Sequence, residues 1–150
     1  MTLYFLDASA WVKRYFHETG SDRVITLFER NNLLSACTLG LIEVNATAAR
    51  KRSAGNIDQT RFQQTKSRLL EDWGRLLWVE LTPEVRETAL QVAETYALRG
   101  ADSVHLASAL LLQTQLEISS HDFNFVSSDQ ELNVAARAAG LSVIDPEHGF

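Results

Sequence analysis

The sequence LYFLDASAWVKRYF at residues 3–16 contains the junction that decides the fold. Its apolar start, together with the preceding threonine, predicts a buried strand over residues 2–6. Asp7 follows at once, and small residues then lead into an amphipathic run that predicts a helix over residues 9–16. A core strand that passes directly into a helix is typical of α/β proteins. The carboxylate at this junction is therefore either a partner of the helix terminus or part of a functional site.

The rest of the chain repeats this alternation of strand and helix. Further strands are expected at residues 33–37, 76–81, 123–127 and 141–145. Further helices are expected at residues 21–30, 39–54, 58–73, 83–98, 102–115 and 130–139. Pro83 suits the first turn of its helix, whereas Gly100 and Gly140 suit helix ends. The alternation predicts a three-layer α/β/α fold with a mainly parallel central sheet of about five strands. The consecutive helices within 39–73 should form a projecting helical hairpin.

Length and composition indicate an ordinary globular protein. The 150 residues favour one domain, residues 1–150. A hydrophobic content of 45%, a charged content of 22% and only two prolines argue against disorder. No apolar run approaches the ~20 residues of a membrane helix, and no basic residue precedes the first apolar stretch. We therefore expect a cytoplasmic protein with no membrane partner. The single Cys37 excludes an internal disulfide and a cysteine-based zinc cage.

Charge is distributed unevenly along the chain. The formal net charge is −5, yet residues 1–75 hold 11 basic and 8 acidic residues, whereas residues 76–150 hold 3 and 11. Half of the basic residues form a basic segment between positions 50 and 75: Arg50, Lys51, Arg52, Arg61, Lys66, Arg68 and Arg75. This segment is either a solvated face of the hairpin or a surface for phosphates or an acidic peptide. Lys13 and Arg14, close to Asp7 in sequence, are further candidates for a phosphate contact.

Four carboxylates fall where strands end or helices begin. Asp7 follows the strand at 2–6, and Asp129 follows the strand at 123–127 after two serines. Glu43 lies in an apolar stretch one turn into a helix, and Asp102 opens another helix. Taken singly, each has a structural alternative, because acids near helix N-termini complement the dipole and aspartate is a favoured N-cap. The sequence leaves this choice open for each residue alone.

Together the four carboxylates favour a functional site. Parallel α/β sheets place ligand sites at the carboxyl ends of their strands, so these side chains should converge there. Converging carboxylates raise one another's pKa unless a cation neutralises them. Oxygen ligands without cysteine or clustered histidine select a hard cation, Mg²⁺ or Mn²⁺. Such an ion activates water and stabilises charge on a phosphoryl group, so the set points to phosphodiester hydrolysis.

Three neighbouring residues have weaker claims to this site. Asp122 precedes its strand and is expected at the opposite edge of the sheet. Ser103 competes with Asp102 for the helix N-cap. His105, three residues after Asp102, invites a role as general base, but a histidine in the first turns of a helix is more often structural.

The motifs that hold these acids resemble those of the PIN-domain ribonucleases. They read LDASAWVKRYF (6–16), SACTLGLIEVNATAARKRSAG (35–55), LRGADSVHLASAL (98–110) and FVSSDQELNVAARAAGLSVIDP (125–146). The likeness is greatest to the VapC-type toxins of bacterial toxin–antitoxin pairs, with the four motifs in the family's order. It implies that Asp7, Glu43, Asp102 and Asp129 jointly hold Mg²⁺ or Mn²⁺.

The resemblance also implies an activity and partners. It implies an endoribonuclease that cuts single-stranded or loop RNA and leaves a 5′-phosphate and a 3′-hydroxyl. It further implies a homodimer silenced by a small antitoxin whose C-terminal segment lies in the active-site groove. Ala8 departs from the hydroxyl residue that many relatives carry, and Ser127 replaces a frequent threonine. Ser9 is retained and is expected to orient Asp7 or a bound phosphate.

Three alternatives follow from the same residues. A PIN nuclease could act in RNA processing without an antitoxin. A haloacid-dehalogenase-like phosphatase also has an aspartate after its first strand, but it needs a second aspartate where this chain has Ser9. A receiver domain needs a late lysine, and no lysine follows Lys66. The two absences disfavour the last two classes.

Overall fold

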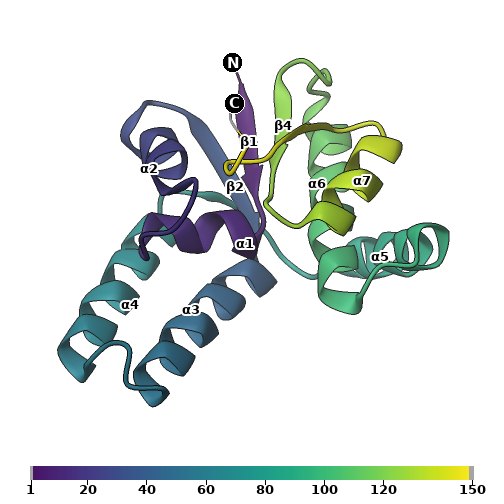
Figure 1. The fold of residues 1–150 in the computed structure, drawn as a ribbon. Coiled ribbons are helices and arrows are strands. Elements are labelled where there is room, and N and C mark those ends of the chain that lie inside the picture. The colour runs from purple at the N-terminus through teal and green to yellow at the C-terminus, as the bar shows by residue number, and fades with distance from the viewer. Residues whose placement is uncertain (1, 149–150) are drawn as a thin grey trace.

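The computed structural model describes residues 2–148 and contains a five-stranded parallel sheet. Its strands are β1 (Leu3–Leu6), β2 (Leu33–Cys37), β3 (Leu77–Val79), β4 (Phe123–Val126) and β5 (Ser142–Ile144). They lie in the order β3-β2-β1-β4-β5, and every neighbouring pair is parallel. The mainly parallel sheet expected from the sequence is confirmed, and β1 lies at its centre (Figure 1).

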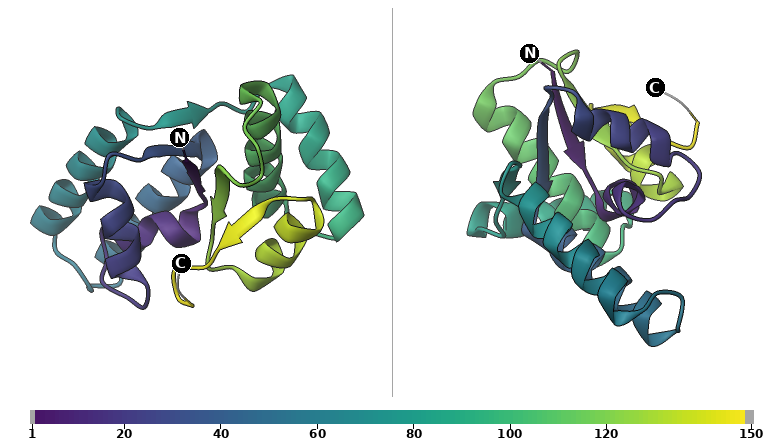
Figure 2. Two further views of the ribbon diagram at one scale, coloured as in Figure 1. Left: turned by 90° about the horizontal axis from the view of Figure 1, so that it is seen from above. Right: turned by 90° about the vertical axis from the view of Figure 1, so that its left-hand side faces the viewer.

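Helices cover both faces of the sheet and complete the expected three layers (Figure 2). The helices are α1 (Ala8–Trp11), α2 (Ser21–Glu29), α3 (Thr38–Ser53), α4 (Gln59–Trp73), α5 (Pro83–Tyr96), α6 (Gly100–Leu116) and α7 (Gln130–Ala138). Successive side chains of a strand point to opposite faces, and β1 illustrates this. Leu3 and Phe5 are buried in the core beneath α5, α6 and α7, whereas Leu6 is buried in the core shared with α1 to α4. Helices α3 and α4 form the projecting hairpin (Figures 1 and 2).

Two expected helix boundaries differ from the structure. The helix expected at 9–16 is a single turn of α1 followed by a 3₁₀ helix at Val12–Arg14. This tighter turn brings Tyr15 and Phe16 into the core, where each is less than a tenth exposed. Gly100 does not end a helix but begins α6, since α5 ends at Tyr96 and its left-handed cap is Ala97 (φ 54°).

The parallel arrangement places the ends of all five strands at one edge of the sheet, where the chain enters α1, α3 and α7. Asp7 directly follows β1 and is the N-cap of α1. Cys37 is the last residue of β2 and the N-cap of α3. Asp129 caps α7 two residues beyond Ser127. Within residues 2–148, no helix is long and apolar enough to cross a membrane.

Candidate active site

A hollow of about 320 Å³ lies at the carboxyl edge of the sheet and brings the four predicted carboxylates together. Its lining residues are Asp7, Ala8, Ser9, Glu43, Arg99, Ala101, Asp102, His105 and Asp129. They come from four distant parts of the chain: the β1–α1 junction, α3, the start of α6 and the start of α7. The convergence expected from strand-end positions is therefore present in the structure.

Asp7 is the most buried of these carboxylates, with 3% of its surface exposed. It caps α1 by accepting a hydrogen bond from the backbone N–H of Ala10 at 3.0 Å. Its Oδ2 also accepts from the hydroxyl of Ser127 at 2.7 Å, and Ser9 donates to Oδ1 at 2.8 Å. Burial nevertheless raises the pKa of Asp7, and the charge of His105 and these hydrogen bonds only partly offset that effect. Asp7 therefore caps a helix, as the structural alternative expected, and also lines the hollow.

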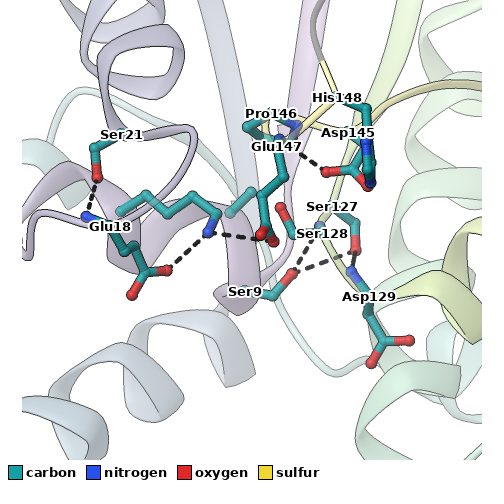
Figure 3. Close-up of polar contacts among 12 residues, drawn as sticks. Ser9, Glu18, Ser21, Ser127, Ser128, Asp129, Asp145, Pro146, Glu147 and His148 are labelled. Atoms are coloured by element: carbon teal, nitrogen blue, oxygen red, sulfur yellow. Dashed lines mark hydrogen bonds and ion pairs between the residues drawn. The ribbon is translucent and has the colours of Figure 1, made fainter.

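The serines around Asp7 join the ends of β1 and β4 (Figure 3). The hydroxyl of Ser9 accepts a hydrogen bond from the backbone N–H of Ser128 at 3.0 Å. The hydroxyl of Ser127 accepts one from the backbone N–H of Asp129 at 3.1 Å while it donates to Asp7. Ser127 is fully buried, so this network holds the Asp7 carboxylate and the backbone of Asp129 in one frame. The expectation that Ser9 orients Asp7 agrees with this geometry.

Asp102 and Asp129 share a single cation. Arg99 donates from Nε to Oδ2 of Asp102 at 3.2 Å and from Nη2 to Oδ2 of Asp129 at 3.1 Å. Burial first, and then the charge of Asp129, raise the pKa of Asp102, while Arg99 acts in the opposite direction. Asp102 lies in the first turn of α6 without capping it, because Arg99 occupies the N-cap position.

Glu43 is held by a buried histidine. Its carboxylate is about one third exposed and pairs with Nε2 of His105, whose side chain is 3% exposed. The other ring nitrogen, Nδ1, lies 3.3 Å from Sγ of Cys37. Burial by itself would lower the pKa of His105, but the hydrogen bonds with Cys37 and Glu43 raise that pKa well above its ordinary value. The apolar stretch around Glu43 suggested a buried side chain, but the side chain is about one third exposed.

The sequence did not identify Arg99 as a site residue, and it gave His105 a minor claim. The signal for Arg99 was its position three residues before Asp102, which places both side chains on the same face at the start of a helix. The signal for His105 was the same spacing after Asp102. Neither spacing could reveal that Arg99 also contacts Asp129 or that His105 pairs with Glu43. These partners are 30 and 62 residues away in sequence.

Lys13 and Arg14 do not line the hollow. Lys13 is only 4% exposed and its Nζ pairs with Glu18 at 2.8 Å and with Glu147 at 3.5 Å. Figure 3 shows the two acids that pair with Lys13, Glu18 and Glu147, away from Asp129. Arg14 pairs with the buried Asp72 through Nε at 3.1 Å. The phosphate contacts expected of these two residues therefore have no support in the structure.

Much of the basic segment packs on aromatic rings. The side chains of Lys51 and Arg61 lie over Phe16, Arg52 lies over Phe62, and Arg68 lies over Tyr15. Such cation–π contacts tie the helical hairpin together and to the body of the domain. Arg50 differs, because it lines a groove of about 260 Å³ that shares Ala8, Ser9 and Glu43 with the acidic hollow.

The donor set suits a hard divalent cation, although the carboxylates do not enclose one as they stand. Across residues 2–148, no three histidine, cysteine, aspartate or glutamate side chains are arranged to hold one ion. The carboxylates instead engage Arg99, His105 and the serine hydroxyls. Burial is the main cause of the raised pKa values of Asp7 and Asp102, so both carboxylates are poorly solvated and a bound cation would stabilise their charged forms. Carboxylate oxygens of this kind fit Mg²⁺ or Mn²⁺.

Comparisons with known proteins agree with this arrangement. The family model for the PIN domain matches residues 4–138. Two proteins of Mycobacterium tuberculosis, ribonuclease VapC45 of strain CDC 1551 / Oshkosh and ribonuclease VapC49 of strain ATCC 25618 / H37Rv, are each 32% identical over 143 residues. Each match covers 95% of this chain and 95% of the relative.

Solved structures share the fold at lower sequence identity. FitAcB from Neisseria gonorrhoeae has a TM-score of 0.67 and 16% identity, and the match covers 97% of this chain and 99% of that one. A toxin–antitoxin complex from Klebsiella pneumoniae has a TM-score of 0.64 and 13% identity, with 97% and 98% covered. These likenesses extend over nearly the whole chain, so the acidic hollow lies within the shared fold.

Proposed function

The chain belongs to the PIN-domain family and is of the VapC type, and from this we propose that it is a metal-dependent endoribonuclease, the toxin of a type II toxin–antitoxin pair. The observation that carries the proposal is the convergence of four carboxylates from distant segments on one hollow. The ribonuclease names of the two 32% identical relatives support the same reaction class. PIN membership sets the phosphatase alternative aside.

In this proposal Asp7, Glu43, Asp102 and Asp129 hold Mg²⁺ or Mn²⁺. The bound ion supplies a Lewis acid for the phosphoryl group of the RNA backbone. Ser9 and Ser127 fix the orientation of Asp7, because their hydroxyls hold its two carboxylate oxygens. Burial of the Asp7 carboxylate leaves its charge poorly solvated, which strengthens its attraction for a cation.

The groove beside the hollow supports a path for the RNA or for an antitoxin segment. Ala8, Val12 and Ile42 give it apolar walls, and Arg50 supplies a positive charge at its edge. A nucleotide that flanks the cleaved bond could place its base on these walls and its phosphate near Arg50. An antitoxin peptide would meet the same surface with apolar and acidic side chains.

The proposed partners extend to a cognate antitoxin and a second copy of the chain, in the cytoplasm. Several proteins of the same fold were solved as toxin–antitoxin assemblies, including VapBC2 from Rickettsia felis bound to promoter DNA. A short reading frame next to the gene, with a DNA-binding N-terminus, would favour the toxin assignment. Its absence would favour the alternative, a PIN nuclease of RNA processing without an antitoxin. Light scattering on the purified chain tests the homodimer.

The decisive experiment compares Asp102→Asn with Asp122→Asn. Asp122 is an exposed aspartate directly before β4 and outside the hollow, and so it is a matched control for charge and chemistry. With Mg²⁺ or Mn²⁺ present, the wild type and Asp122→Asn should cleave labelled total RNA, whereas Asp102→Asn should not. Chelation by EDTA should stop cleavage by the wild type and by Asp122→Asn. Cleavage that continues in EDTA would overturn the metal-dependent mechanism.

A further inference from the structure

We propose that Arg99 exchanges anions during the reaction: it neutralises Asp102 and Asp129 before the metal binds and contacts an RNA phosphate afterwards. The proposal rests on the proposed function, because it concerns the same metal site and the same substrate. It adds a substrate-binding residue that is basic and lines the acidic hollow. Unlike the cations of the basic segment that pack on aromatic rings, this side chain engages only carboxylates in the hydrogen bonds described above.

The geometry shows that Arg99 occupies the space between two of the proposed ligands. Its Nε and Nη2 lie 3.2 and 3.1 Å from carboxylate oxygens of Asp102 and Asp129, so a single guanidinium spans the two acids. These acids stand at the N-termini of α6 and α7 and are brought together only by the fold. A divalent ion that bridged the same two oxygens would occupy the space of the guanidinium, and two adjacent cations repel each other, so binding of the ion would displace Arg99.

The side chain of Arg99 is free to make this exchange. It is 72% exposed, whereas the side chains of Asp102 and Asp129 are 14% and 23% exposed. Because the guanidinium itself is exposed, solvent screens these ion pairs and a divalent cation can displace the arginine at modest cost. The backbone of Arg99 is extended at the N-cap of α6 (φ −65°, ψ 156°), which anchors the side chain at the rim of the hollow.

Once released, the guanidinium would remain at the mouth of the hollow, where the substrate phosphate must enter. Arginine matches the geometry of phosphate oxygens with two parallel N–H donors. The other basic residues expected to make this contact lie elsewhere, because Lys13 pairs with Glu18 and Glu147, and Arg14 pairs with Asp72. Arg99 is therefore the guanidinium that lines the hollow itself.

The test uses Arg99→Gln, with Arg86→Gln as the control. Arg86 is an exposed arginine of α5 that pairs with the exposed Glu87, so its loss removes the same charge outside the hollow. Mn²⁺ affinity is measured by titration calorimetry without RNA. Arg99→Gln should bind Mn²⁺ roughly three- to tenfold more tightly than the wild type, the scale of two ion pairs that solvent screens on the arginine side. Arg86→Gln should match the wild type.

The second measurement is single-turnover cleavage of RNA at saturating Mn²⁺. Arg99→Gln should raise the RNA concentration for half-maximal rate roughly tenfold, and Arg99→Lys should restore part of this loss because it keeps the charge. Unchanged or weaker Mn²⁺ binding by Arg99→Gln would overturn the exchange, and so would an unchanged half-maximal RNA concentration. Failure of the wild type to bind Mn²⁺ or cleave RNA would instead reject the proposed function.

Discussion

Two buried aspartates in this protein have opposite surroundings. Asp72, at the end of α4, is 5% exposed and accepts hydrogen bonds from Nε of Arg14 at 3.1 Å and from the hydroxyl of Tyr15 at 2.7 Å. Asp7, at the end of β1, is 3% exposed and is held by two serine hydroxyls and a backbone N–H. A cation neutralises the first carboxylate directly, whereas neutral donors hold the second.

The difference separates a structural carboxylate from a functional one. A buried charge that is paired and hydrogen-bonded is tolerated, and removing its partner is costly. Burial and the neighbouring Asp72 raise the pKa of Tyr15 far above its ordinary value, so this phenol remains a donor at all physiological pH values. The charge of Asp7 is only partly compensated by His105 and by its hydrogen bonds, which favours a cation beside it. Three predictions test whether the two aspartates differ in this way, and a fourth compares two arginines of the basic segment.

The largest expected effect is the loss of RNA cleavage in the variant Asp7→Asn. Asparagine keeps the shape of the side chain and its capping oxygen but removes the charge, so cleavage of RNA should fall roughly a thousandfold or more. Single-turnover rates with Mg²⁺ measure this loss. A variant that retains more than a tenth of the wild-type rate would show that Asp7 is structural, like Asp72.

The next effect is on stability and concerns Asp72→Ala. This variant leaves Arg14 and Tyr15 without their shared acceptor and should cost about 3 kcal/mol, or roughly 6–12 °C in Tm. Cleavage per folded molecule should stay at the wild-type level, as measured after circular dichroism establishes the folded fraction. Arg14→Met should likewise lower Tm and leave the half-maximal RNA concentration unchanged. A rise in that concentration would restore Arg14 as a phosphate ligand.

A smaller effect separates the members of the basic segment. Arg50 lines the groove beside the hollow, whereas Arg75 is exposed and pairs with the exposed Glu71 on α4. Arg50→Glu should raise the half-maximal RNA concentration roughly tenfold, and Arg75→Glu should change it less than about twofold, because only Arg50 can meet a phosphate near the site. Equal effects of the two variants would mean that the segment acts only through its overall charge.

The smallest effect is the pH dependence of stability at Asp7. Burial raises its folded-state pKa above the ordinary 3.8, so the folded protein binds a proton that the unfolded chain has lost. Wild-type stability relative to Asp7→Asn should therefore rise as pH falls from neutrality through the raised pKa toward 3.8. At neutral pH in EDTA, Asp7→Asn should be the more stable by about 1 kcal/mol, or roughly 2–4 °C. Thermal melts across the range from mildly acidic to neutral pH measure the difference, and a lower Tm for Asp7→Asn at neutral pH would contradict it.

The sequence predicted the scaffold and the carboxylates because both depend on local patterns. Strand–helix alternation is visible in runs of a few residues, and parallel topology then places strand ends at one edge of the sheet. The same reasoning places Asp7 and Asp129 at the carboxyl edge from their positions along the chain. It also places Asp122 at the opposite edge, and the backbone carbonyl of that residue indeed bonds to the start of β1.

Only the tertiary structure decided what each charged side chain contacts. Arg99 reaches Asp129 across 30 residues of sequence, and His105 supports Glu43 across 62. Lys13 is adjacent to Arg14 and close to Asp7 in sequence, yet packing turns it toward Glu18 and Glu147. Local sequence determines where a backbone bends, because steric rules act over a few residues. The partner of a long charged side chain depends on which distant segments the closed fold brings within a few ångströms, and no local pattern carries that information.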